Sequence, residues 1–180
     1  MNPVEESKSW LEQVVIGHNF CPFAKQEFDQ DKIRFVLSET GDIERALQTL
    51  ISECERLDDI DEIETTLIIY SDMFSGFEDF LDFVDLANQL ITMQGYEGIY
   101  QLATFHPDYC FAGESEDDAA NYTNRSPYPM LHLIREQSLE KAVKHYPSPE
   151  LIPENNIRLA REKGQAYFKN LLNKIKNKDI

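Results

Sequence analysis

Short β-rich runs alternate with amphipathic helical segments over the first part of the chain, and this order constrains the fold more than any other feature. Ile33, Phe35 and Leu37 recur with a period of two, which predicts a strand. Residues 65–70 are rich in β-forming residues but do not alternate, which is typical of a strand that is covered on both faces. Residues 99–105 form a third strand-like run. Strands separated by helices are typical of βαβ units with right-handed crossovers. We therefore predict an α/β fold with a three-strand βαβαβ core sheet flanked by helices, followed by a long polar loop and C-terminal helices.

Apolar side chains at helical spacing predict the helices. Thr40 is the expected N-cap of the second helix, and Ser75 with Glu78 has the spacing of a capping box at the start of the third. Gly17 and Gly95 are expected to end the first and third helices. The expected helices cover residues 3–16, 42–57, 76–94, 130–145 and 156–177.

The chain is strongly acidic, with a formal net charge of −16, yet 42% of its residues are hydrophobic. This apolar content predicts a folded core, and 180 residues fit a single domain over residues 1–180. An acidic body repels phosphate backbones, so nucleic acid is not an expected partner. The basic stretch at residues 158–180 is expected to be a solvated helix face.

The sequence has no segment with the order of a signal peptide and no apolar run near the roughly 18 to 20 residues that span a bilayer. We therefore expect no membrane association. The three cysteines fit a reducing compartment better than a disulfide framework, which predicts a cytoplasmic protein.

A long polar stretch without periodicity follows the third strand-like run. Such loops in compact domains are usually functional or disordered, and the aromatic side chains of this one argue against disorder. Because the ligand crevice of an open α/β sheet lies at the carboxyl ends of its strands, we expect the functional site here. The polar candidates in and just after this loop are His106, Asp108, Asp117, Asp118, Asn121, Asn124, Arg125, Tyr128, His132 and Arg135.

His106, Asp108 and His132 are the catalytic candidates. They could form an acid/base set, or they could bind a divalent metal such as Zn²⁺ or Fe²⁺ with positions left open for substrate. We expect these three side chains to converge with Arg125 on one concavity at the carboxyl end of the third strand.

Arg125, Asn124, Arg135 and Tyr128 are the candidates for holding a substrate. The planar fork of a guanidinium suits a carboxylate or a phosphate, which predicts a small anionic ligand. The alternative is that His106, Asp108, Arg125 and Asn124 tie down the loop through hydrogen bonds and an ion pair, without any ligand.

Cys21 is a candidate reactive thiol. The segment at residues 21–24, Cys-Pro-Phe-Ala, resembles the one-thiol version of a glutaredoxin motif, and His18 could activate it, but it follows a helix rather than a strand. The alternative is a packed small residue. Cys54 lies on an apolar helical face, so we expect it to be buried and inert while Cys21 is partly accessible. Glycine-rich phosphate loops and a G-x-S-x-G elbow are absent.

Four segments of unusual composition carry a family resemblance. They are CPFA at residues 21–24, FHPDY at 105–109, NYTNRSPYP at 121–129 and LHLIRE at 131–136. In these segments the chain resembles a bacterial family of uncharacterised proteins, domain of unknown function 1415, over nearly its whole length. The resemblance directs attention to the same loop and implies no particular reaction.

Two functions follow as hypotheses. The first is a small cytosolic enzyme that acts on a small anionic molecule or peptide through His106, Asp108, His132 and Arg125. The second is a non-catalytic binding or interaction module in which the polar cluster is a structural network and the acidic body attracts a basic partner. Ionisable groups gathered in a pocket favour the first function, and a flat exposed loop favours the second.

Overall fold

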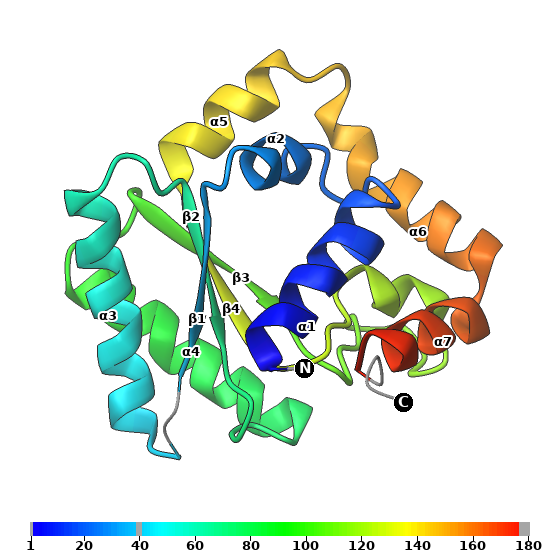
Figure 1. The fold of residues 1–180 in the computed structure, drawn as a ribbon, viewed down its shortest axis with the longest axis horizontal. Coiled ribbons are helices and arrows are strands. Elements are labelled where there is room, and N and C mark those ends of the chain that lie inside the picture. Colours follow the sequence, from blue (N-terminus) through cyan, green and yellow to red (C-terminus); the bar gives the residue numbers. More distant parts are fainter. Residues whose placement is uncertain (1, 39–40, 177–180) are drawn as a thin grey trace.

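The computed structural model describes residues 2–38 and 41–176 of the chain. A four-stranded sheet carries helices on both faces (Figure 1). The strands are β1 (Ile33–Leu37), β2 (Thr65–Ile69), β3 (Tyr100–Phe105) and β4 (Met130–Arg135). The α-helices are α1 (Pro3–Trp10), α2 (Ala24–Asp29), α3 (Ile43–Asp59), α4 (Phe77–Met93), α5 (Glu136–His145), α6 (Ile152–Lys163) and α7 (Gln165–Lys176). The other helical segments are the π-helix η1 (Leu11–Ile16) and the 3₁₀-helices η2 (Ala119–Thr123) and η3 (Pro149–Leu151).

The sheet confirms the α/β class and contains all three predicted strands, but it has a fourth strand at its centre. The strand order is β1-β2-β4-β3, with β1 and β2 parallel and β4 antiparallel to both β2 and β3. The prediction that a helix begins near residue 130 is therefore wrong, because α5 begins only at Glu136. A run as short as Met130–Arg135 does not separate a period of two from one of 3.6. Pairing with two distant strands decides its structure.

Each face of the sheet has its own apolar core. Helices α3 and α4 pack on one face, and α1, η1 and α7 pack on the other (Figure 1). Successive side chains of a strand point to opposite faces, so Leu131 and Leu133 of β4 enter the first core while Met130 enters the second. The central strand therefore stabilises both layers.

Two predicted helix caps differ from those in the structure. The N-cap of α3 is Asp42, whose Oδ1 accepts a hydrogen bond from the Glu44 backbone N–H at 2.9 Å. Thr40, the predicted cap, lies outside the described residues. The capping box expected at Ser75 is not formed, because the N-cap of α4 is Gly76, which has no side chain to bond the first turn of the helix.

The C-terminal segment forms two helices where one was predicted over residues 156–177. Helix α6 ends at Lys163, and the following Gly164 has a φ of 82°, a conformation that favours glycine and breaks the helical path before α7. The short helix α2 was not predicted. No helix in the described part of the chain has both the length and the apolar character needed to cross a bilayer.

Candidate functional site

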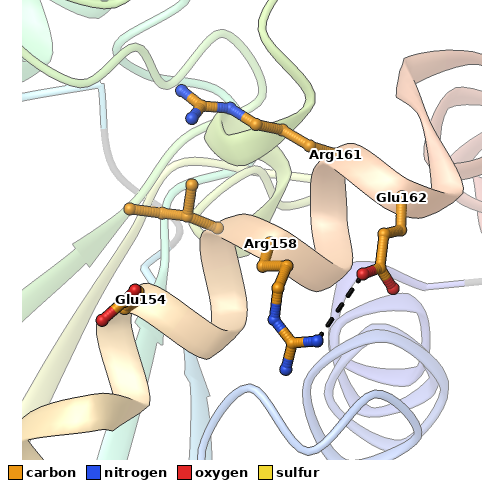
Figure 2. A pocket seen from close by; sticks show the side chains of 5 residues that line it. Glu154, Arg158, Arg161 and Glu162 are labelled. Atoms are coloured by element: carbon orange, nitrogen blue, oxygen red, sulfur yellow. Dashed lines mark ion pairs between the residues drawn. The ribbon is translucent and has the colours of Figure 1, made fainter.

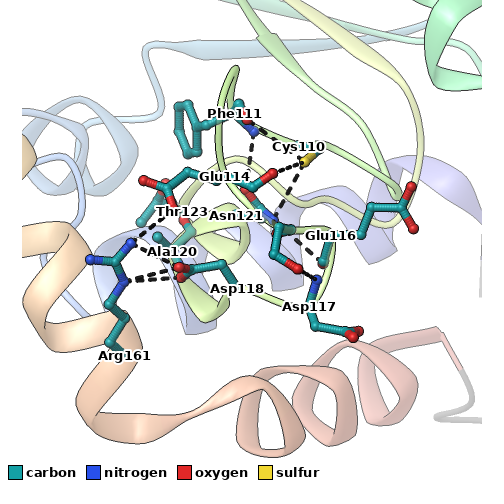
Figure 3. Close-up of polar contacts among 11 residues, drawn as sticks. Cys110, Phe111, Glu114, Glu116, Asp117, Asp118, Ala120, Asn121, Thr123 and Arg161 are labelled. Atoms are coloured by element: carbon teal, nitrogen blue, oxygen red, sulfur yellow. Dashed lines mark hydrogen bonds and ion pairs between the residues drawn. The ribbon is translucent and has the colours of Figure 1, made fainter.

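The loop after β3 is folded around the side chain of Asn121, as Figure 3 shows. Asn121 is fully buried. Its Oδ1 accepts the Phe111 backbone N–H at 3.0 Å, and its Nδ2 donates to the Ser115 carbonyl at 2.8 Å. One buried amide thus replaces the water that these backbone groups would otherwise need.

His106 fixes the start of this loop against α4. Its Nδ1 accepts the backbone N–H of Asp108 at 3.0 Å, which leaves the proton on Nε2, and Nε2 donates to the Phe74 carbonyl at 2.9 Å. The buried ring also packs against Phe77 and Phe80, with centroid separations of 5.2 and 5.3 Å. Burial lowers the pKa of His106. Both ring nitrogens are occupied by the protein itself, while the Asp108 side chain is exposed.

Arg125 and Asn124 close the loop from its other end. The Arg125 guanidinium donates from Nε to the Tyr109 carbonyl at 3.0 Å and from Nη2 to the Glu116 carbonyl at 2.9 Å. The Asn124 amide donates to the carbonyl of Thr104 in β3 at 3.1 Å. These donors bind backbone oxygens in place of an anionic ligand.

Asp117 and Asp118 tie the loop to the C-terminal helices. The Asp118 carboxylate accepts hydrogen bonds from both Nε and Nη2 of Arg161 in α6, the shortest at 2.8 Å, and the same guanidinium contacts Glu114 at 3.0 Å (Figure 3). These bonds from Arg161 lower the pKa of Asp118 to about 2. The Asp117 carboxylate accepts the Gln165 amide of α7 at 3.2 Å.

Arg135 and Tyr128 lie away from the loop's centre and have partners of their own. The Arg135 guanidinium donates to the carbonyls of Leu57 and Ile63, where α3 ends and the chain turns toward β2. The Tyr128 hydroxyl donates to the buried Glu6 carboxylate at 2.7 Å.

His132 does not join His106, and the predicted convergence of the four side chains is not observed. His132 projects from β4 toward the face that carries α1, whereas His106 packs on the α4 side of the sheet. Within residues 2–38 and 41–176, no three His, Cys, Asp or Glu side chains are grouped as ligands for a metal ion.

A pocket of about 420 Å³ lies where His132 emerges, between the sheet and the helices α1, η1, α2 and α5. Figure 1 shows α2 and α5 at the edge of this face, beyond the cover that α1 gives. Most of the wall is apolar, with contributions from Trp10, Leu11, Phe23, Leu67, Phe105 and Leu139. The polar groups at this wall are Cys21, Glu27, Glu64, Thr65, His132, Ser138 and Lys141.

A hydroxyl on the neighbouring strand sets the tautomer of His132. Thr65 Oγ1 lies 2.6 Å from both the Leu133 carbonyl and His132 Nε2. The hydroxyl has one proton, and the carbonyl can only accept, so Thr65 donates to Leu133 and accepts from Nε2–H. His132 Nδ1 therefore carries a lone pair, and it has no partner among the described residues. Burial lowers the pKa of His132 to about 4, so the ring is neutral at pH 7.

The two cysteine environments agree with the predicted ranking. Cys21 is half-buried at the pocket wall, and burial raises its pKa. Cys54 is fully buried in the core under α3, where burial raises its pKa to about 12. Neither thiol is activated as a nucleophile by this geometry.

A second depression lies on the surface of α6. Its lining comes from this one helix, with Glu154, Arg158, Arg161 and Glu162 around it, and Arg158 pairs with Glu162 at 3.6 Å (Figure 2). A hollow formed by one helix face cannot enclose a ligand as the sheet pocket can.

Sequence reasoning identified His132 and Cys21 but missed most of the pocket. Trp10 falls within the helix predicted over residues 3–16, and Glu27 lies in the unpredicted helix α2. Glu64 precedes β2 and Thr65 begins it, in a run that was interpreted only as a strand covered on both faces. One sequence feature could have indicated the pocket. Thr65 begins a fully buried strand, and a buried hydroxyl needs a hydrogen-bond partner.

Comparison with known proteins places the chain in a family. The model of the family described as "Protein of unknown function (DUF1415)" matches residues 2–170, so the chain belongs to this family. The resemblance in the four segments is thereby confirmed. No curated protein and no solved structure matches the chain.

Replacement of His106 tests the structural role of the loop. His106→Ala is expected to lower the free energy of unfolding by about 2–4 kcal/mol, because it removes two buried hydrogen bonds and a packed ring. Asp108→Asn, at an exposed side chain, should change it by less than about 0.5 kcal/mol. Urea denaturation measures both. Unchanged stability of His106→Ala would show that the ring does not hold the loop.

The lowered pKa of His132 predicts a dependence of stability on pH. A folded-state pKa below the ordinary 6.5 means that the unfolded chain binds the proton more readily, so the contribution is complete above about pH 6.5 and is lost as the pH falls toward 4. We expect His132 to account for about 3 kcal/mol of the loss between pH 7 and pH 4. His132→Gln should remove this component from denaturation curves, and His145→Gln, at an exposed site, should retain it. Identical pH profiles for the two variants would contradict the assignment.

Proposed function

We propose that this protein binds a small, largely apolar molecule in the sheet pocket, with the His132 ring at the molecule's polar end. The observation that carries the proposal is the Nδ1 lone pair of His132, which has no partner among the described residues and lies in the wall of an otherwise mainly apolar pocket. A volume of about 420 Å³ lies within the range of roughly 300–1,000 Å³ that is usual for small-ligand sites. Apolar walls with a few oriented polar groups are typical of such sites.

The environment of His132 supports binding more than acid/base catalysis. A general base works best when its pKa lies near the working pH, and burial lowers the pKa of His132 to about 4. At pH 7 such a ring is a good hydrogen-bond acceptor and a weak base. Of the two functions weighed from the sequence, the non-catalytic binding protein therefore has the better support.

The contacts of the loop also support that choice. An enzyme site at His106, Asp108 and Arg125 would need free donors and acceptors facing a ligand. His106 and Arg125 instead satisfy backbone groups of the loop and of the segment before α4, as a structural network does. The same holds for Arg135 of β4, which donates to carbonyls at and beyond the end of α3.

We also propose the cytoplasm as the compartment and a small molecule rather than a nucleic acid as the partner. Cys21, Cys54 and Cys110 are all unpaired, which supports a reducing environment. The net charge of −16 opposes contact with phosphate backbones.

A pocket-filling substitution tests the proposal. Ala103 lies in the pocket wall on β3, so Ala103→Leu should occupy part of the cavity, whereas Ala112→Leu places the same bulk on an exposed part of the loop. The probe is 2-phenylethanol, and the reporter is the fluorescence of Trp10, the single tryptophan, which itself lines the pocket.

Wild-type protein and Ala112→Leu are expected to show a saturable change with a Kd on the order of 1 mM, a value in keeping with a ligand of this size. Ala103→Leu should weaken binding at least about tenfold, because the larger side chain excludes the phenyl ring of the probe. A linear, unsaturable response in the wild type, or equal affinity in Ala103→Leu, would refute a ligand site in this pocket.

A further inference from the structure

We infer that the ligand of the sheet pocket is an organic cation, a small apolar molecule that carries a protonated amine. The inference rests on the proposed function and adds the charge of the ligand to it. It follows from the hydrogen-bonding groups that the pocket leaves without partners.

Two carboxylates line the pocket. Glu27 of α2 and Glu64, which precedes β2, are half-buried. One oxygen of each, Oε2 of Glu27 and Oε1 of Glu64, is shielded from solvent and has no hydrogen-bond partner among the described residues. A carboxylate oxygen in this position destabilises the protein unless a donor reaches it, and a positively charged donor compensates best.

His132 adds a third acceptor to the same wall. Thr65 takes the Nε2 proton, so the ring offers the pocket only the lone pair of Nδ1. A carboxylate or phosphate on a ligand would face two glutamates and this lone pair, and all three would repel it. An ammonium group has three N–H donors and no acceptor, so its hydrogen-bonding character and its charge both suit a wall of acceptors and carboxylates.

The residues that line the pocket carry little opposing charge, although Lys32, outside the lining, hydrogen-bonds through its backbone to Glu27 and Glu64. Among the described residues of the lining, Lys141 has the one cationic side chain, and it is exposed on α5, where its long stem can turn the ammonium toward water. The aromatic rings of Trp10, Phe23 and Phe105 in the wall attract a cation through their faces. The net charge of −16 also draws cations toward the protein.

Three probes of similar shape and different charge test the inference. They are 2-phenylethylamine, 2-phenylethanol and 3-phenylpropionate, each titrated against the intact protein with Trp10 fluorescence as the signal. The amine is expected to bind about tenfold more tightly than the alcohol, because charge-assisted hydrogen bonds replace neutral ones, and the acid is expected to bind most weakly.

Matched substitutions identify the groups responsible. The Glu27→Gln/Glu64→Gln double variant should abolish the preference of the amine over the alcohol while leaving the affinity for the alcohol within about threefold. Glu62→Gln removes the same charge from an exposed residue two positions before Glu64 and should keep the preference. If the double variant does not fold, Glu64→Gln alone should reduce the preference.

The outcomes separate the two proposals. Binding of the alcohol or the acid as tightly as the amine overturns the inference but leaves a ligand pocket in place, as does an amine preference that survives both glutamine substitutions. Failure of all three probes to produce a saturable signal overturns the proposed function, and the inference with it.

Discussion

The position of β4 between β2 and β3 is the constraint on which the rest of the structure depends. Its antiparallel ladders join β3 to the parallel pair β1 and β2, and its side chains enter both cores. The same alternation that sends Leu131 and Leu133 toward α3 and α4 sends His132 to the opposite face. There Thr65, on the adjacent strand β2, holds the ring in one tautomer. A strand pairing therefore fixes both the fold and the chemical character of the pocket.

A high density of polar residues in a sequence does not show how many polar atoms are available to bind a ligand. The loop after β3 holds the larger number of ionisable side chains, but its backbone has little regular structure and must be satisfied by side chains. Asn121, His106 and Arg125 form these hydrogen bonds with the loop backbone, and Arg161 of α6 binds the loop at Asp118. The pocket has fewer polar groups, yet Nδ1 of His132 and one oxygen each of Glu27 and Glu64 lack partners among the described residues.

The sequence predicted those parts of the fold that have a local signal. The period of two in β1, the apolar run of β2 and the long amphipathic helices α3 and α4 are visible within one segment. β4 was mistaken for a helix because its six residues give no clear period and its partners, Thr65–Ile69 and Tyr100–Phe105, are far away in sequence.

The candidate site was predictable only in part, for the same reason. His132 and Cys21 drew attention through their residue types, and both line the pocket. Their placement there depends on the register of β4 against β2, where His132 is opposite Leu67, and on the packing of α2 and α5 beside the sheet. Neither can be inferred from spacing along the chain. The rule that ligands lie at the carboxyl ends of strands pointed to the loop, whereas the pocket reaches the amino ends of β1 and β2 at Ile33 and Thr65.

The most direct test of a ligand site on the sheet, rather than in the loop, is to map the backbone amide shifts of ¹⁵N-labelled protein during titration with 2-phenylethanol. A ligand in the sheet pocket should cause saturable shifts concentrated at Cys21, Ala103, His132 and Ala142, which come from four separate segments and all line the pocket. Shifts concentrated instead at Tyr109, Asn121 and Arg125 would place the site in the loop and contradict the account.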